Sequence, residues 1–201
     1  MKIPHWIIAA ILTATLLAAT QAPAADPEAI KYYNSGVRKY RQGDLDGSLN
    51  DLSKAIAIDP QYWKAINSRG VVKRAKGDLD GALSDHTLAI KLNPDNAAAY
   101  SNRGVILRDK GDLAGALADY SRALQLDPND GYTYNNRGAI RADQGNLDEA
   151  IADFSRAIEL MPNYAEAYFN RGVCRQRKGD LDGARTDRAK AIQLDPRLGT
   201  K

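Results

Sequence analysis

Apolar residues recur along the chain at the spacing of α-helices, in two blocks separated by a glycine. Between residues 97 and 110, Tyr100, Gly104 and Leu107 share one face of a predicted helix. After Gly111 a second helical pattern begins, and its apolar members are Leu113, Ala116, Leu117, Tyr120, Ala123, Leu124 and Leu126. The pattern predicts two helices joined at the glycine, which together form a helical hairpin.

The residues at the ends of these blocks agree with this interpretation. Gly111 suits the left-handed residue that ends a helix, and Asp112 suits the N-cap of the next helix. Asp127 precedes Pro128 and is expected to end the second helix, because the residue before a proline avoids the α conformation. The helix macrodipole favours negative charge in the first turn of a helix. The second helices carry acidic residues there, which are Asp46, Asp80, Asp148 and Asp182.

The hairpin pattern is repeated five times along the chain at a constant interval of 34 residues. Four columns keep this register: Gly36, Gly70, Gly104, Gly138 and Gly172; Gly43, Gly77, Gly111, Gly145 and Gly179; Ala55, Ala89, Ala123, Ala157 and Ala191; Pro60, Pro94, Pro128, Pro162 and Pro196. One hairpin buries too little surface to offset the entropy of ordering it, so the units are expected to stack. The repetition predicts an all-α solenoid of five antiparallel helix-turn-helix repeats, at 29–62, 63–96, 97–130, 131–164 and 165–198.

Small residues at fixed positions indicate how each hairpin closes. The column that contains Gly104 lies mid-helix, where glycine costs ~1 kcal/mol relative to alanine, so a close approach of the partner helix is expected there. The opposing small surface is the column Ser48, Ala82, Ala116, Ala150 and Ala184. The pattern does not explain the glycines in the first turn of the second helices, which are Gly47, Gly81, Gly115 and Gly183, with Glu149 in the fourth unit.

These columns resemble the tetratricopeptide repeat family. The family pattern of aromatic, glycine, alanine, aromatic, alanine and proline is matched by Tyr100, Gly104, Ala116, Tyr120, Ala123 and Pro128, and again by Tyr134, Gly138, Ala150, Phe154, Ala157 and Pro162. The resemblance extends over residues 29 to 198. It implies a right-handed superhelix whose first helices line a concave groove, and in this family that groove usually binds peptides.

The implied groove is lined by residues one helical turn apart on each first helix. The predicted partner-binding residues are Tyr33, Tyr40, Asn67, Arg74, Ser101, Arg108, Tyr132, Asn135, Phe169 and Gln176, and the floor beneath them is Val37, Val71, Val105, Ala139 and Val173. Aromatic, amide and guanidinium groups over an apolar floor suit an extended peptide or a partner helix. The family's carboxylate clamp needs Lys and Asn where this chain has mainly Asn or Ser and Val, so that mechanism is not expected. The alternative for each residue is a solvated concave face.

Two charged columns depart from the family pattern. Where the family usually has an aromatic residue after the glycine, this chain has Lys39, Lys73, Leu107, Arg141 and Arg175. A second column, Arg69, Arg103, Arg137 and Arg171, precedes the glycine, with Ser35 in the first unit. An unbroken acidic column runs through the second helices as Asp51, Asp85, Asp119, Asp153 and Asp187. We predict that each arginine pairs with the aspartate of its own hairpin, and the alternative is a basic binding stripe.

Residues 1 to 24 follow a different pattern. Lys2 is their only charge, an apolar run extends from Trp6 to Ala19, and small residues stand at Ala22 and Ala24. This segment is predicted to be a bacterial secretory signal peptide that is cut after Ala24, which would place the chain in the periplasm or outside the cell. The alternative is an uncleaved anchor, but the run is shorter than the ~20 residues that span a bilayer, so no membrane span is expected after cleavage.

Composition and single reactive residues add little chemistry. With 44% hydrophobic and 26% charged residues the chain is typical of globular proteins, and a net charge of +3 without a basic run does not favour nucleic acid. His86 and Cys174 occupy columns otherwise filled by packing residues, so both are expected to be structural, although Cys174 has an intermolecular disulfide as its alternative. The sequence shows no catalytic motif, metal site or cofactor site, and an enzyme is not expected.

The function predicted from the sequence is a protein-protein interaction scaffold of the bacterial envelope. The alternatives are a glycan or small-ligand module that uses Tyr132 and Phe169 as stacking platforms, and an accessory subunit that regulates an envelope enzyme. Self-association is also open, because Ile30, Tyr32 and Tyr33 could pair head-to-head.

The fifth unit is expected to be a polar terminal cap that ends the array. It carries Arg185 where earlier units have leucine or isoleucine, and Arg188 where they have Leu52, His86, Tyr120 and Phe154. Those two columns are expected to face a following repeat, and a terminal repeat needs a polar outer face.

Overall fold

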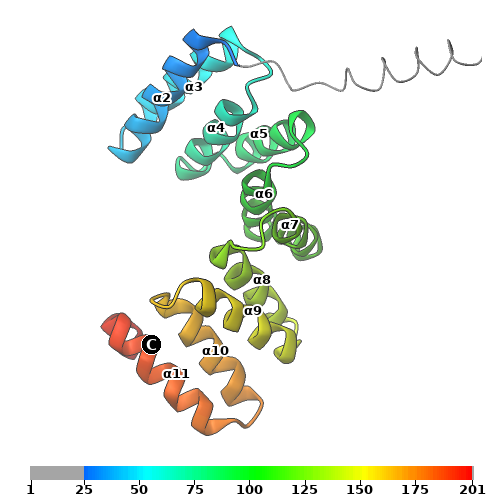
Figure 1. Ribbon diagram of the computed structural model, residues 1–201, viewed down its shortest axis with the longest axis vertical. Coiled ribbons are helices and arrows are strands. Elements are labelled where there is room, and N and C mark those ends of the chain that lie inside the picture. Colours follow the sequence, from blue (N-terminus) through cyan, green and yellow to red (C-terminus); the bar gives the residue numbers. More distant parts are fainter. Residues whose placement is uncertain (1–24, 201) are drawn as a thin grey trace, which may run out of the picture.

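The computed structural model describes residues 25 to 200, and the predicted signal peptide lies outside these residues. The described part contains ten α-helices and a short 3₁₀ helix, and no strand (Figure 1). Their bounds are α2 Pro27–Arg41, α3 Leu45–Ile58, α4 Trp63–Ala75, α5 Leu79–Leu92, α6 Ala97–Asp109, α7 Leu113–Leu126, α8 Gly131–Asp143, α9 Leu147–Leu160, α10 Ala165–Arg177, α11 Leu181–Leu194 and η1 Pro196–Thr200.

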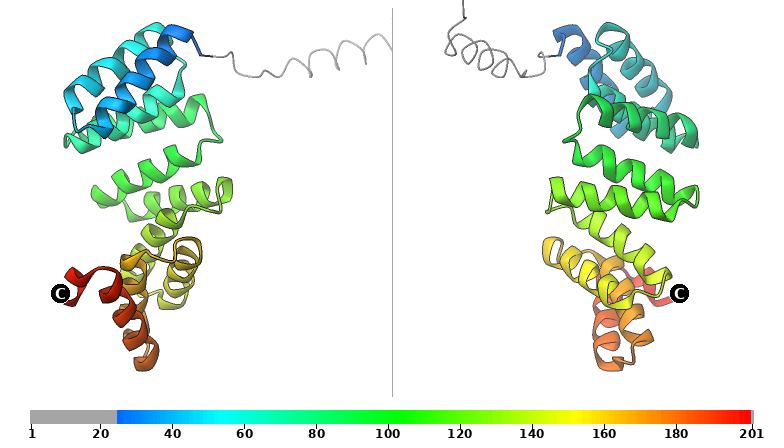
Figure 2. Two further views of the ribbon diagram at one scale, coloured as in Figure 1. Left: turned by 60° about the vertical axis from the view of Figure 1, so that its left-hand side comes forward. Right: turned by 90° about the vertical axis from the view of Figure 1, so that its right-hand side faces the viewer.

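The helices stack in successive pairs along an arc (Figures 1 and 2). Each first helix packs on the second helix of its own pair, and each second helix packs on the first helix of the next pair. First helices also contact one another, as α2 contacts α4 and α8 contacts α10. This places the first helices on the inner side of the arc, where α4 and α6 are visible in Figure 1. The predicted α-solenoid is confirmed.

The turn inside each pair explains the first-turn glycines. Gly111 has a φ of 85°, and the carboxylate of Asp112 accepts a 2.9 Å hydrogen bond from the backbone N–H of Gly115. A Cβ on Gly115 would lie 2.4 Å from that carboxylate, so glycine leaves the capping side chain in place. The fourth unit supports this account, because Asn146 makes no side-chain cap bond and Glu149 takes the place of the glycine.

Four of the five mid-helix glycines receive a large side chain, and only Gly172 faces the backbone and Cβ atoms of its partner helix. A Cβ on Gly104 would lie 2.7 Å from Cε1 of Tyr120, and Gly36 meets Leu52 in the same way. Tyr120 is fully buried and also packs on Ile140 of the next unit. The expected close approach is therefore present, but one aromatic or aliphatic side chain both closes its own hairpin and joins it to the following one.

Buried ion pairs hold the hairpins together, as predicted. Arg103 donates two hydrogen bonds of 2.7 and 2.8 Å to the carboxylate of Asp119, whose side chain is 7% exposed. Unit one uses Ser35, whose hydroxyl donates to Asp51 at 2.7 Å. The other two-point pairs are Arg69–Asp85, Arg137–Asp153 and Arg171–Asp187. The confirmed pairing accounts for the arginine column without a basic binding stripe.

A second cation reaches most of these aspartates, which the sequence analysis missed. Arg141 lies 2.8 Å from the carboxylate of Asp153, and Lys73 and Arg175 make the same contact in their own units. In the first unit, where Ser35 replaces the arginine, Lys39 is the cation that contacts Asp51. Leu107 leaves the third unit with one cation. Burial opposes ionisation of Asp51, but hydrogen bonds from Lys39 and Ser35 outweigh it and lower the pKa of that carboxyl.

Exposed ion pairs also link neighbouring units. Lys110 Nζ lies 2.6 Å from Asp80 of the preceding unit, and Lys76–Asp46 and Lys178–Asp148 repeat this contact. At the corresponding positions between units three and four, Gln144 and Ala114 replace both partners together. Each exposed pair is worth about 0–1 kcal/mol, so these links contribute to the register between units more than to total stability.

Candidate partner-binding groove

The predicted partner-binding residues lie on the inner helices, but they differ in how far they are free to bind. Tyr132 is 57% exposed, Tyr40 is 38% exposed, and Arg74 and Gln176 are also exposed. Tyr33, Asn67, Ser101, Arg108 and Phe169 are half-buried, and Asn135 is buried.

Several amide and hydroxyl groups of the groove are bonded to neighbouring helices. Asn135 donates to the hydroxyl of Tyr164 at 3.2 Å and accepts from Asn170 at 3.1 Å. The Asn67 oxygen lies 2.9 Å from Nδ1 of His86, and the hydroxyl of Ser101 bonds to that of Thr133. The bonds of Asn135 and Ser101 join neighbouring units and that of Asn67 joins α4 to α5 of its own pair, so little of the hydrogen-bonding capacity of these groups faces a partner.

A small charged cluster lies in the middle of the inner face. Arg74 approaches Asp109 at 3.4 Å, and Arg108 contacts Asp109 at 3.2 Å and the Asn136 oxygen at 3.4 Å. The Arg74 side chain is 47% exposed and that of Arg108 is 34% exposed. Both guanidinium groups keep donors available for an acidic or carbonyl-rich partner.

Exposed apolar side chains gather on the same face. Seven large apolar side chains are exposed among the described residues, and four of them stand at inner positions of first helices: Ile30, Tyr40, Tyr132 and Val173. Hollows lie beside the valine column, one of 160 Å³ at Val37 and Val71 and one of 190 Å³ at Ala139 and Val173. Small apolar hollows beside exposed aromatics are typical of protein-binding surfaces.

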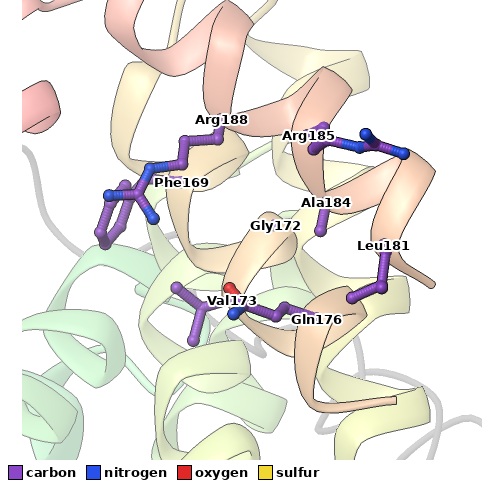
Figure 3. A pocket seen from close by; sticks show the side chains of 8 residues that line it. All are labelled: Phe169, Gly172, Val173, Gln176, Leu181, Ala184, Arg185 and Arg188. Atoms are coloured by element: carbon purple, nitrogen blue, oxygen red, sulfur yellow. The ribbon is translucent and has the colours of Figure 1, made fainter. Parts of the chain in front are cut away.

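Two further features flank this face. Tyr132 stands edge-to-face with Tyr164, with ring centroids 5.1 Å apart, and both border a 570 Å³ hollow at the turn after α9. On the other side of α10, a hollow of 410 Å³ is lined by Phe169, Val173 and Gln176 together with residues of α11 (Figure 3). The expected polar cap is thus only partly polar, since Leu181 in this hollow is 59% exposed.

The titratable groups beneath the groove are tuned by burial. Burial lowers the pKa of His86 to about 4, raises that of the Tyr120 hydroxyl to about 12, and raises that of the buried Cys174 thiol. Within residues 25 to 200, no cluster of His, Cys, Asp and Glu could hold a metal ion. The same part of the chain has no helix with the length and apolar character of a membrane span.

Family models match the C-terminal two thirds of the repeat array. A TPR repeat model matches residues 104–145 and 138–179, and tetratricopeptide repeat models match residues 87–118 and 165–198. The sequence has no significant match among curated proteins.

Solved structures share the fold over most of the chain. A crystal structure of MamA is 23% identical over 83% of this chain and 97% of its own, with a TM-score of 0.70. The Pseudomonas aeruginosa pilF structure is 19% identical over 88% of this chain and 85% of its own, with a TM-score of 0.77. YrrB, described as a TPR protein with an unusual peptide-binding site, is 26% identical over 86% and 94%, with a TM-score of 0.67.

Proposed function

Because the chain belongs to the tetratricopeptide repeat family, we propose that it is a non-catalytic scaffold whose inner face binds a segment of a partner protein. Proteins with this fold typically act as scaffolds without catalysis. The observation that carries the proposal is the gathering of exposed apolar side chains, among them Tyr40 and Tyr132, at inner positions of the first helices.

The bound segment is expected to place apolar side chains in the hollows beside Val71 and Val173 and a carboxylate or carbonyl group near Arg74. Aromatic and arginine anchors supply most of the affinity at such interfaces. A glycan module is less well supported, because the amide of Asn135 beneath Tyr132 is already bonded to Tyr164 and Asn170.

The first test places a photo-crosslinking residue at position 132 and, as control, at position 88. Leu88 is 40% exposed but lies on a second helix, outside the groove. We expect cross-links from position 132 to fall on one continuous segment of one partner, and a peptide of that segment to bind the purified protein. Tyr40→Ala should weaken the binding of that peptide by about tenfold or more, because truncating an anchor residue costs over ~1 kcal/mol of binding free energy. Leu88→Ala should leave the binding of the peptide unchanged. Equal cross-linking from both positions would contradict the proposal.

We also propose that the scaffold works in the bacterial envelope, which rests on the leader-like pattern of residues 1 to 24. N-terminal sequencing of the protein purified from its host checks this. The expected first residue is Ala25, and an intact Met1 together with recovery from the cytoplasm would refute it.

A further inference from the structure

We propose that the outer end of the last helical pair is a second docking site, which adjoins the inner groove at Phe169, Val173 and Gln176 and extends onto α11, and that it takes an amphipathic helix carrying acidic residues. The site is the 410 Å³ hollow in Figure 3, here called the end slot, formed by Phe169, Gly172, Val173, Gln176, Leu181, Ala184, Arg185 and Arg188.

The chain itself shows what kind of element fits the end slot. The same positions one unit earlier hold Ala139, Ala142, Leu147, Ala150, Ile151 and Phe154, among others. These side chains pack around Cys174 of α10. Earlier units repeat the arrangement, since Tyr120 and Ala116 pack on Ile140 of α8. The equivalent surface is therefore covered by an α-helix that presents a buried apolar residue, and the shape of the end slot suits the same element.

The described residues leave the end slot open to solvent. Leu181 is 59% exposed and Val173 is 40% exposed, whereas Leu198 of η1 packs elsewhere, against Ala165 and Ala191. An apolar hollow with exposed side chains of this size is a candidate binding surface.

Charge distinguishes the end slot from its internal counterparts. Arg185 and Arg188 stand where the fourth unit has Ile151 and Phe154; the Arg185 side chain contacts Asp182 one turn earlier on α11 and is 79% exposed, so its other donors face solvent. The last pair, residues 165 to 194, carries seven basic and four acidic side chains. A docking helix therefore needs apolar residues at its centre and acidic residues beside them, because a basic helix would be repelled.

The same argument disfavours a second copy of this chain as the occupant. The helix of a copy that is free to dock is α2, and it carries Arg38 where later units bury Val72, Ile106, Ile140 and Cys174. It also carries Lys31 where they bury Ala65, Ala99, Thr133 and Ala167. Head-to-tail stacking would place Arg38 beside Arg188, because Ile140 packs on Tyr120 and Cys174 on Phe154, and it would bury Lys31 against Ala191, because Ala99 packs on Ala89 and Ala167 on Ala157.

The chain supplies a matched pair of probes. Helix α6 covers the corresponding surface of α4 and α5, so a stapled peptide of residues 97–109 has the required apolar shape. Burial is the main cause of the lowered pKa of His86, and Arg103 of α6 lies close enough for its charge to contribute; His86 holds the position of Arg188. The acidic probe is this peptide with Arg103→Glu and Arg108→Glu, and the basic probe is the unchanged sequence.

Fluorescence anisotropy with the purified full chain tests the proposal. We expect the acidic probe to bind about tenfold more tightly than the basic one, because its glutamates attract the exposed arginines and the arginines of the basic probe are repelled by them. Arg185→Leu/Arg188→His, which copies the surface that α6 covers, should reduce this preference to less than threefold. Arg156→Leu removes an exposed charge on α9, outside the end slot, and should preserve the preference.

The remaining arms separate this site from the inner groove and from self-association. Leu181→Gln should abolish binding of the acidic probe and Tyr132→Ala should leave it unchanged, so failure of the groove proposal does not affect this result. Equal binding of both probes, or cross-linking of the acidic probe to α4 or α6, would overturn the proposal. So would concentration-dependent oligomers that Leu181→Gln dissociates, since a second copy would then be the occupant.

Discussion

Two buried aspartates with different numbers of cations give a direct test of how the hairpins are stabilised. Replacing Arg103 by Met leaves the Asp119 carboxylate buried without a cation, whereas replacing Arg137 by Met leaves Asp153 with Arg141 at 2.8 Å. Both arginines lie over a tyrosine ring, at 5.7 and 5.6 Å, and Arg137 differs by one further hydrogen bond of 3.4 Å to the hydroxyl of Ser121.

The magnitude follows from burial. Breaking a buried pair costs about 3–5 kcal/mol, and since the Arg103 side chain is 22% exposed we expect about 3 kcal/mol for Arg103→Met. Arg137→Met should cost about 1–2 kcal/mol, because the remaining guanidinium still neutralises Asp153. Urea unfolding followed by helical circular dichroism measures both values, provided that the slopes with denaturant agree.

Two rescue variants identify the cause. Adding Leu107→Arg to Arg103→Met supplies the second cation that the fourth and fifth units have, and should recover at least half of the loss. Adding Asp119→Asn instead should also recover stability, because it removes the unpaired charge. Equal costs for Arg103→Met and Arg137→Met, or no rescue by either change, would refute the account of the ion pairs.

Three other predictions follow from packing and capping. The pKa of His86 falls from 6.5 to about 4 on folding, so as the pH is lowered the unfolded chain takes up the proton before the folded chain does. The free energy of unfolding should therefore drop by about 2 kcal/mol from pH 7 to pH 5. Thermal melts at the two pH values measure this drop, and the contribution of His86 should be missing from it in His86→Leu. Gly104→Ala should destabilise by about 1–2 kcal/mol, because its Cβ would press on a buried tyrosine ring, while Gly172→Ala, whose nearest neighbour is 3.2 Å away, should cost less in the same urea assay. Gly115→Ala should destabilise the native protein but stabilise an Asp112→Ala variant, and additive effects in this double-mutant cycle would show that the cap does not select the glycine.

The sequence predicted the architecture because the residues that define it repeat. Gly111 and Asp112 determine a turn by local chemistry alone, and the arginine and aspartate columns recur together because they touch. The joint exchange of Lys and Asp for Gln144 and Ala114 was an equally good signal for the contacts between units. The basic column that ends with Arg175 was a comparable signal for contacts within a unit, because Arg175 pairs with Asp187 of its own hairpin.

The groove was harder to predict because its side chains must be placed against neighbouring units. Asn135 belongs to a predicted lining position, yet its amide is buried between Tyr164 and Asn170. A single helix pattern gives the face on which a side chain lies but not the hydrogen bonds that already occupy it. The role of Gly115 depends on the side-chain conformation of Asp112, which the sequence pattern does not give.

The missing links of the fourth unit have a mechanical consequence. Between units three and four Gln144 and Ala114 replace the exposed lysine–aspartate pair, and Asn146, the N-cap of α9, makes no side-chain cap bond. Bending of the solenoid should concentrate at this joint, and amide hydrogens in the first turn of α9 should exchange faster than those of α7. A flexible joint in the middle of the inner face would let the two halves of the groove change their separation. The groove could then close on partners of different thickness, with one rigid half on each side of the partner.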